Sequence, residues 1–409
     1  MGADEEDIVV GEGAEPQAKL WKQPLNLVCQ VDAAIYGSGG IARYAEAMVA
    51  GLVAYGQRPK LFWVKQDAPA ERRDPFDESL ERLVYTPRPV KFGKRRGLKW
   101  LKPVASRLER WSGEREAKRL LAKSDLYWSM CHRLYDVPGS KKIVTIHDAI
   151  AALTDRYHSP EEIGAFSKFL SRVRKLADLI FVPSEATKDD LVKRLKFNED
   201  KIEVLPSPLD EIFLNPPDEL PEPDVRRPYI LSVGTLGARK DLAGLLNAYG
   251  IFRREVGERV LLVLVGRRLE SSRLAELVAS SAFSDDIVHT GFIDDATLVA
   301  LYRNASIFCY PSLAEGFGYP VAEAMALGAP IVAYRLPSIE QMTENRAAKL
   351  VPAGDSDALA RAMLEVWHST ELAERLSKHG RMFAQRFAPR KLAMRAVKLI
   401  RDRLVAPEV

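Results

Sequence analysis

The sequence is poor in cysteine and has no long apolar run, and both absences narrow the class of protein. Its 409 residues include 3 cysteines, Cys29, Cys131 and Cys309, which are far apart. An odd number of distant cysteines suggests neither a disulfide framework nor a zinc site, so we expect a reducing, cytoplasmic environment. No run approaches the ~20 apolar residues that span a bilayer. The N-terminal segment is acidic and lacks the apolar core of a secretory signal.

What the sequence does contain is a regular alternation of short apolar runs and longer helical patterns. This alternation predicts parallel sheets covered by helices on both faces. The predicted strands lie at 25–31, 60–64, 125–130, 141–147, 179–184 and 202–207, and then at 229–235, 259–266, 286–291, 306–312, 329–334 and 348–353.

One proline-rich stretch interrupts this alternation. Seven prolines lie within residues 205–228, and a segment that loses so many backbone donors cannot continue a sheet. We therefore predict two doubly wound domains that face one another across a cleft. The expected organisation is a disordered acidic tail at 1–22, a first Rossmann-like domain at 23–205, a linker at 206–228, a second Rossmann-like domain at 229–386 and a terminal helical segment at 387–409.

The stretch EGFGYPVAE, residues 315–323, places a carboxylate at each end of a short glycine-containing loop. It follows a predicted strand, and Pro320 favours a helix start because proline suits the first helical position. Gly316 and Gly318 permit positive φ angles and a close approach of the backbone to a ligand. Free N–H groups at a helix start are suited to phosphate. The stretch therefore predicts an anion-binding loop.

The two glutamates of this loop can each accept hydrogen bonds from vicinal hydroxyls. Glu323, in the first turn of the predicted helix, suits a ribose diol, and Glu315, at the strand's carboxyl end, suits a sugar ring. The alternative is a dipole-stabilising helix glutamate and an unrelated loop glutamate. The complete nonapeptide on a strand, loop and helix favours the binding interpretation.

A second stretch, SVGTLGARKDL at 232–242, offers two cations after a strand. The turn at Gly234 and Thr235 precedes Arg239 and Lys240. Two fixed cations can neutralise a departing diphosphate, which is work that a metal does in other enzymes. The alternative for an Arg-Lys pair is a solvated surface, but its place after the turn favours a functional role.

The extended stretch YPSLAEGFGYPVAEAMALGAPIVA, residues 310–333, resembles the E-x7-E signature of family 4 of the retaining glycosyltransferases. That family has the GT-B fold of two facing Rossmann-like domains, and the resemblance covers nearly the whole chain after residue 24. It implies a metal-independent hexosyltransferase that uses a nucleoside diphosphate sugar, of the UDP or GDP type, in glycan, glycolipid or polysaccharide synthesis. The implied acceptor is a saccharide or lipid-linked saccharide bound by the first domain. The segment at 387–409 would cross back onto that domain.

The resemblance also implies roles for individual residues. Glu315 would contact the donor sugar, Glu323 the ribose, and Arg239 with Lys240 the phosphates, with front-face displacement and no protein nucleophile. His147 lies at the carboxyl end of a predicted strand and would hydrogen-bond near the reacting carbon, while Asp148 would orient its loop. The implied catalytic residues are His147, Arg239, Lys240 and Glu315, and the implied donor-binding residues are Gly39, Gly40, Gly234, Thr235, Phe292, Ile293, Gly316, Phe317, Gly318, Tyr319, Pro320, Val321 and Glu323.

Two motifs point to other classes of protein and are better explained locally. YGSGGIARY at 36–44 satisfies a relaxed dinucleotide pattern, but DAAIY separates it from its strand, and no acidic residue lies ~20 positions on. An NAD-dependent oxidoreductase is therefore disfavoured. Asp355, in GDSDAL at 354–359, is expected to cap a helix rather than bind metal. Two other functions remain open: a GT-B phosphorylase, which needs pyridoxal phosphate, and a catalytically silent sugar-nucleotide-binding protein.

The net charge of +4 conceals a basic segment at 88–123, which has thirteen Lys/Arg and three Glu and therefore a local charge of +10. Trp100 and Trp111 lie among these cations. An anionic surface contributes about 1 kcal/mol per nearby Lys or Arg, and tryptophan can anchor at headgroup level. We expect this segment to place the enzyme peripherally at the inner face of a membrane; the alternative is a solvated helix. Nucleic acid is not expected, because no nucleic-acid motif accompanies the charge.

Overall fold

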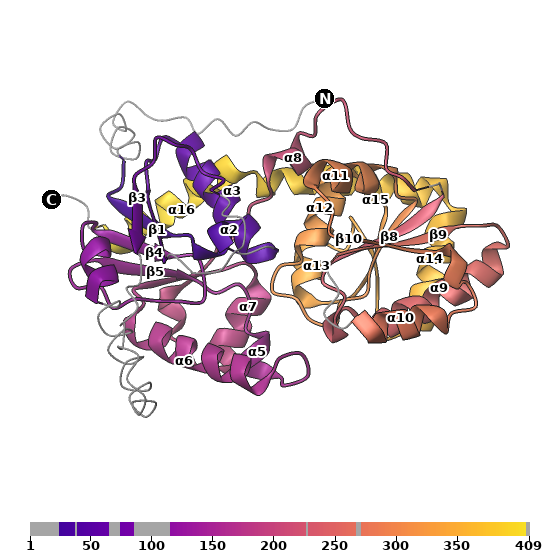
Figure 1. The fold of residues 1–409 in the computed structure, drawn as a ribbon, viewed down its shortest axis with the longest axis horizontal. Helices are drawn as coiled ribbons and strands as arrows, with labels where there is room; N and C mark the ends of the chain where they lie inside the picture. Colours follow the sequence, from indigo (N-terminus) through magenta and orange to yellow (C-terminus); the bar gives the residue numbers. More distant parts are fainter. Residues whose placement is uncertain are drawn as a thin grey trace, which may run out of the picture.

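The computed structural model describes residues 24–36, 39–64, 74–85, 115–225, 228–266 and 271–405. Two lobes lie side by side, each a parallel sheet flanked by helices (Figure 1). The predicted fold class, two facing Rossmann-like domains with doubly wound parallel sheets, is confirmed. The predicted tail at 1–22 and all but residues 115–123 of the basic segment lie outside the described residues.

The first sheet has seven strands, all paired in parallel. In sheet order they are β3 (Arg82–Tyr85), β2 (Lys60–Val64), β1 (Leu27–Gln30), β4 (Leu126–Ser129), β5 (Lys141–Thr145), β6 (Leu179–Val182) and β7 (Ile202–Val204). Successive side chains of β1 enter different cores: Leu27 and Cys29 join one, and Val28 joins the other. Burial on both faces explains why this strand appears as a continuous apolar run.

Helices cover both faces of this sheet. They are α2 (Asp32–Tyr36), α3 (Gly40–Ala54), α5 (Ile150–Leu153), α6 (Pro160–Leu176) and α7 (Glu185–Asp189), with a π-helical turn at Asp190–Arg194 and a 3-10 turn at Glu199–Lys201. A capping box between Ser159 and Glu162 starts α6. Gly56, with φ of 84°, follows the end of α3 in the left-handed conformation that is common for glycine after a helix.

The second sheet has six parallel strands in the order β10-β9-β8-β11-β12-β13. The strands are β8 (Tyr229–Val233), β9 (Leu261–Val265), β10 (Ile287–Gly291), β11 (Ile307–Tyr310), β12 (Ile331–Tyr334) and β13 (Lys349–Val351). Its helices are α9 (Leu242–Val256), α10 (Ser271–Ala279), α11 (Asp295–Asn304), α12 (Tyr319–Leu327), α13 (Pro337–Thr343), α14 (Ser356–His368) and α15 (Thr370–Ala384), with 3-10 turns at Ala238–Lys240 and Ser284–Asp286.

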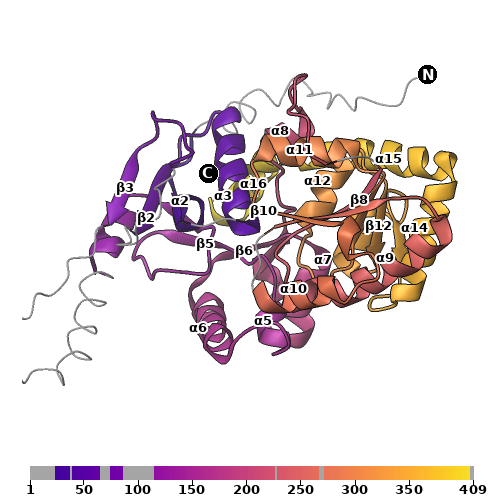
Figure 2. The ribbon, with the colours of Figure 1, turned by 45° about the vertical axis from the view of Figure 1, so that its right-hand side comes forward.

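Two segments join the domains. The proline-rich stretch contains no strand in its described part, but it includes the short helix α8 (Glu211–Leu214), whose Phe213 is fully buried. The helical pattern from about residue 371 to 405 contains Pro389, which predicts a break because proline lacks the N–H that a helix interior requires. A 3-10 turn (Gln385–Phe387) does separate α15 from α16 (Pro389–Leu404) there. Figures 1 and 2 show α16 beside α3 of the first domain. A Cβ on Gly51 of α3 would lie 2.3 Å from the Pro389 carbonyl oxygen, so this contact requires glycine.

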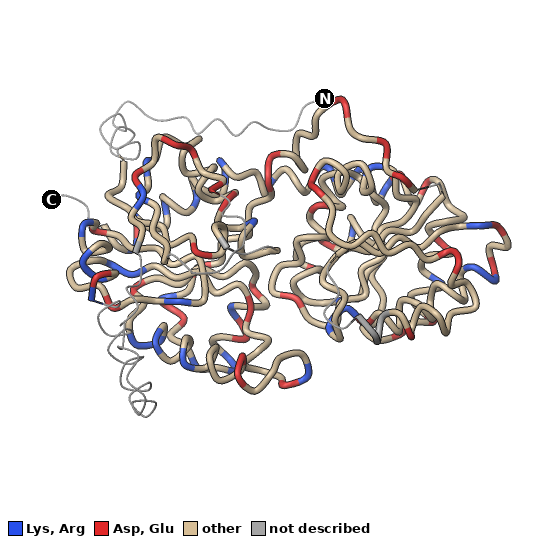
Figure 3. The backbone as a smooth tube through the Cα atoms, viewed as in Figure 1, with Lys and Arg blue, Asp and Glu red and all other residues tan. Residues whose placement is uncertain are grey.

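The sequence-based strand set was incomplete at one edge. β3 was not predicted, because this four-residue edge strand pairs only with β2 and begins with a charged residue. Residues of both signs of charge are spread along the described backbone of both domains (Figure 3). Among the described residues, no helix is long and apolar enough to cross a bilayer.

Candidate functional site

A cavity of about 570 Å³ lies between the two domains. Residues from both domains line it, and many lie just after a strand. Gly234, Gly266 and Phe292 directly follow β8, β9 and β10, and His147 lies two residues after β5. The strand order of the second sheet reverses between β8 and β11, and open α/β sheets bind ligands at such a switch point. The topology therefore explains why the chain places its ligand-binding groups here.

The cavity gathers almost every residue that the sequence predicted to be catalytic or donor-binding. Sixteen of the seventeen line it: Gly39, Gly40, His147, Gly234, Thr235, Arg239, Lys240, Phe292, Ile293, Glu315, Gly316, Phe317, Gly318, Tyr319, Pro320 and Glu323. Val321 does not line the cavity, because its side chain points into the apolar core and is fully buried.

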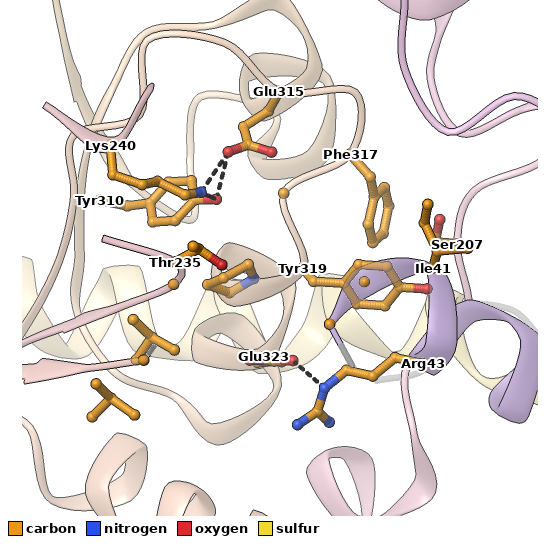
Figure 4. Close-up of a pocket in the computed structure, with 18 of the residues that line it drawn as sticks. Ile41, Arg43, Ser207, Thr235, Lys240, Tyr310, Glu315, Phe317, Tyr319 and Glu323 are labelled. Atoms are coloured by element: carbon orange, nitrogen blue, oxygen red, sulfur yellow. Dashed lines mark hydrogen bonds and ion pairs between the residues drawn. The ribbon is translucent and has the colours of Figure 1, made fainter. Parts of the chain in front are cut away.

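Glu315 is the centre of a charged cluster (Figure 4). Its Oε1 accepts hydrogen bonds from Lys240 Nζ at 2.6 Å and from the Tyr310 hydroxyl at 2.8 Å, and Arg239 Nη1 lies 3.3 Å from Oε2. Ser312 donates a further bond to Oε1 at 2.7 Å. Burial alone would raise the pKa of Glu315, but Lys240 and Arg239 bring it to about 2. The carboxylate is therefore ionised at neutral pH.

Lys240 is positioned by its surroundings as well as by Glu315. Its Nζ also donates to the Tyr310 hydroxyl and lies 4.2 Å from the centroid of that ring. Burial lowers the pKa of Lys240, while the Glu315 charge opposes this change. Gly234, with φ of 144°, passes so close that a Cβ would lie 3.1 Å from Lys240 Cε. The glycine after β8 therefore leaves room for the lysine side chain.

The loop after β11 contacts the first domain directly at Gly316. A Cβ added there would lie 2.0 Å from the His147 carbonyl oxygen. The Gly316 carbonyl accepts a hydrogen bond from Ser184 Oγ at 2.7 Å, and the Glu315 carbonyl accepts one from Ser338 Oγ at 3.0 Å. The loop is therefore held from both sides of the domain interface.

His147 is oriented by the backbone of the neighbouring strand. Its Nε2 lies 3.1 Å from the Met130 carbonyl oxygen, and its ring meets Tyr44 edge-on at 4.8 Å. A carbonyl oxygen only accepts, so Nε2 carries the proton and Nδ1 can accept. Burial lowers the pKa of His147 to about 3, and His132 adds to the effect. His147 is therefore a neutral imidazole. Asp148 accepts a hydrogen bond from Ile150 N at 3.0 Å and so orients the loop, as predicted.

Glu323 lies in the second turn of α12, not the first, because the helix begins at Tyr319, one residue before Pro320. Its Oε2 accepts a hydrogen bond from the Tyr302 hydroxyl at 2.9 Å. Arg43, from α3 of the first domain, places Nε 3.8 Å from Oε1 (Figure 4). Glu323 is only 3% exposed, yet it lines the cavity.

Gly39 and Gly40 before α3 line the cavity, as do the predicted donor-binding residues Phe292 and Ile293 after β10. Gly39, with φ of 96°, precedes α3, and a Cβ on Gly40 would lie 3.1 Å from the Tyr319 ring. Phe292 is 76% exposed, so its ring is free to contact a planar ligand. Ile293 lies beside it at the cavity.

Several cavity residues were not predicted from the sequence. They include Arg43, Tyr310, Ser207 and Gly266. A Cβ on Gly266 would lie 2.0 Å from the Gly234 carbonyl oxygen, so the turns after β8 and β9 touch through their backbones. The glycine that ends VLLVLVG could have revealed this contact. Arg43 carried no local signal, because its partners lie far along the chain.

The Asp-x-Asp in GDSDAL is a helix start, as predicted. The Asp355 side chain accepts from Ala358 N at 2.8 Å and caps α14. Within the described ranges, no group of three or more His, Cys, Asp or Glu side chains could hold a metal ion.

Comparisons with known proteins agree with this arrangement. Residues 38–211 match the family model Glycosyltransferase Family 4, and residues 219–383 match Glycosyl transferases group 1. O-antigen chain mannosyltransferase B of Escherichia coli is 28% identical over 63% of this chain and 68% of its own length. MMP alpha-(1->4)-mannosyltransferase of Mycolicibacterium hassiacum is 30% identical over 53% of this chain and 52% of its own length, so the match spans about half of that relative.

Solved structures share the fold over nearly the whole chain. Sucrose-phosphate synthase of Thermosynechococcus elongatus has a TM-score of 0.71 at 19% identity, covering 93% of this chain and 98% of that one. The Anabaena protein HepE, solved with UDP and glucose, has a TM-score of 0.67 at 16% identity, covering 92% of this chain and 99% of that one. At these identities the likeness shows the fold alone.

Proposed function

This chain belongs to the GT-B glycosyltransferases of the family 4 and group 1 type, and from that premise we propose that it is a retaining hexosyltransferase. The proposed donor is a nucleoside diphosphate sugar of the UDP or GDP type, and the acceptor is a hydroxyl of a saccharide or lipid-linked saccharide. The names of the relatives favour a mannosyl unit. The observation that carries the proposal is the single cavity in which Arg239, Lys240 and Glu315 lie together with Glu323.

The cavity offers a separate group for each part of such a donor. Figure 4 shows Glu315 beside Lys240 and Tyr310, and Glu323 beside Arg43, with the loop through Phe317 and Tyr319 between them. We place the ribose at Glu323, the transferred sugar at Glu315 and the diphosphate against Arg239 and Lys240. The exposed ring of Phe292 suits the base.

Transfer in this arrangement depends on charge developing at the diphosphate. As the glycosidic bond breaks, negative charge grows on the leaving oxygen, and the fixed cations Arg239 and Lys240 stabilise it. The leaving oxygen then helps to deprotonate the attacking acceptor hydroxyl on the same face of the sugar. Neutral His147 can accept a hydrogen bond through Nδ1 near the reacting carbon. No protein nucleophile is needed, and the donor's anomeric configuration is retained.

The proposal is tested by screening UDP, GDP and ADP sugars for thermal stabilisation, and then assaying transfer or slow hydrolysis in excess EDTA. A ligand at ~100 times its Kd stabilises by about 2.7 kcal/mol. We expect a UDP or GDP sugar to stabilise the protein and its turnover to persist in EDTA, because two side-chain cations serve the diphosphate. Loss of turnover in EDTA with rescue by manganese or magnesium would contradict metal independence. Binding without turnover would indicate a sugar-nucleotide-binding protein, and a product of inverted configuration would contradict retention.

The two glutamates are expected to separate binding from turnover. Glu323→Gln removes a charged acceptor for the ribose, so free nucleoside diphosphate should bind about 1.5–3 kcal/mol more weakly. Glu315→Gln removes the negative charge that pairs with Lys240 and Arg239, so the affinity for free nucleotide should not fall. Turnover of the sugar nucleotide should fall. Calorimetry and initial rates measure both effects. Glu365→Gln, at a surface ion pair with Lys349, is the control, and equal losses of nucleotide affinity at positions 315 and 323 would refute the assignment.

The basic segment at 88–123 lies mostly outside the described residues. We retain the proposal that it contacts an anionic membrane surface, on the strength of its local charge of +10. Co-sedimentation with anionic vesicles that disappears at high salt is the expected behaviour. A protein that stays in solution at low salt would favour a soluble acceptor.

A further inference from the structure

Arg43 belongs to the first domain but is held by groups outside it. Its Nη1 lies 3.0 Å from Asp210 Oδ2, in the stretch that joins the domains, and its Nη2 lies 2.5 Å from Asp295 Oδ1, in α11 of the second domain. The guanidinium carbon also lies 5.0 Å from the centroid of Phe213 in α8. Two hydrogen-bonded carboxylates and one aromatic face therefore fix this side chain at the domain boundary.

The relation of Arg43 to Glu323 is different. Nε lies 3.8 Å from Oε1, which is an ion pair beyond hydrogen-bond length. Glu323 Oε2 already accepts from Tyr302, whereas no donor among the described residues hydrogen-bonds to Oε1. Arg43 thus supplies charge to Glu323 and leaves one carboxylate oxygen able to accept from a ligand. That oxygen lies on a residue that lines the cavity.

The positive charge of Arg43 matters for the ionisation of Glu323, because Glu323 has little contact with water. Burial raises the pKa of Glu323, and the neighbouring carboxylates of Asp210 and Asp295 raise it further. The Arg43 charge and the Tyr302 hydroxyl oppose this rise. The only cation among these neighbours comes from the other domain.

We propose that Arg43 is a positioning residue for the nucleotide: it reaches across the domain boundary to supply the counter-charge of Glu323, so the ribose site is complete only when the domains are closed. The inference rests on the proposed role of Glu323 as the ribose acceptor. It predicts that nucleotide binding and domain closure are linked, although Arg43 itself does not touch the ribose. Arg43 and Glu323 then act as one unit in nucleotide binding.

A double-mutant cycle with UDP and GDP tests this unit. Calorimetry on the full chain compares the wild type with Arg43→Met, Glu323→Gln and the double variant. We expect Arg43→Met to weaken binding of whichever nucleotide the wild type binds more tightly by roughly tenfold, because Glu323 then becomes a poorer charged acceptor. The double variant should bind no more weakly than Glu323→Gln alone, because groups that act as a unit are not additive. Arg43→Lys, which keeps the charge, should recover part of the affinity.

The pH dependence of nucleotide affinity distinguishes an electrostatic role of Arg43 from a merely structural one. Without Arg43, the pKa of Glu323 rises further, so affinity should fall as the pH is lowered and return as it is raised. The ratio of variant to wild-type Kd cancels the titration of the nucleotide's own phosphate. Arg403→Met removes an ion pair between α16 and β7, away from the cavity, and should leave binding unchanged.

The outcomes separate this inference from the proposed function. Additive losses in the cycle, or a ratio that does not change with pH, would overturn the role of Arg43 while leaving nucleotide binding intact. An Arg43→Met protein whose nucleotide affinity is unchanged would also overturn the role of Arg43. A wild-type protein that binds neither nucleotide would overturn the proposed function and this inference with it. Thermal unfolding of each variant shows whether a loss of affinity is a loss of fold.

Discussion

Replacement of Lys240 by methionine is expected to lower the rate of sugar transfer about 10²- to 10³-fold. The ammonium group is one of two fixed cations at the proposed diphosphate site, and it lies 2.6 Å from Glu315. Its loss removes charge stabilisation from the leaving group and leaves the Glu315 carboxylate facing the site with Arg239 alone. Steady-state kinetics with the donor identified by thermal shift measure the effect, which should fall on kcat.

The same change is expected to lower stability, because removing one partner of a buried ion pair costs about 3–5 kcal/mol. The double variant Lys240→Met with Glu315→Gln removes both charges and should recover stability without recovering transfer. Lys349→Met removes an exposed cation paired with Glu365, and serves as the control. Near-normal transfer by the folded Lys240→Met protein would show that the leaving group is stabilised by other residues.

Replacement of Gly316 by alanine is expected to lower turnover roughly 10²-fold, since a displacement of about 1 Å can cost that much. The added Cβ would lie 2.0 Å from the His147 carbonyl oxygen and 2.7 Å from Asp148 Cβ. Both are parts of the first domain, so the loop that carries Glu315 must move away from it. The φ angle of Gly316 is not in the left-handed region, so the effect arises from contact rather than from backbone strain.

Gly164→Ala is the matched control, because nothing lies within 4 Å of a Cβ at that position of α6. It should leave turnover unchanged and stabilise the protein by up to about 1 kcal/mol. Kinetics, thermal unfolding and small-angle scattering together report activity, fold and domain separation. If Gly316→Ala behaves like Gly164→Ala, the domain contact at this loop is not needed for the reaction.

Most strands were predictable because their physical cause is local. β1, β6 and β11 are buried on both faces, and such strands need continuous apolar runs. β3 escaped prediction because it is an edge strand of only four residues that begins with Arg82, so its apolar run is short. The break at Pro389 was also visible, since proline lacks the N–H that a helix interior requires.

The cavity residues also divide into those that local sequence predicted and those that it did not. Glu315, Arg239 and Lys240 were recognised because they lie in the segments that follow strands, and Glu323 because it lies in the helix that directly follows the Glu315 loop. Arg43 was not recognised, because its meaning depends on Asp210, Asp295 and Glu323, which lie 167, 252 and 280 positions away.

The sequence alone determined the two parallel-sheet domains, the order of their strands along the chain and the loops that carry the charged groups. Local pattern is sufficient for these features, because apolar periodicity, glycine and proline act within a few residues. Only the tertiary structure decided which charges meet, Lys240 with Glu315 and Arg43 with Glu323. It also decided that the backbone of Gly316 contacts that of His147. Electrostatic interactions and close packing depend on distance in space, and the folding of two domains against each other sets that distance.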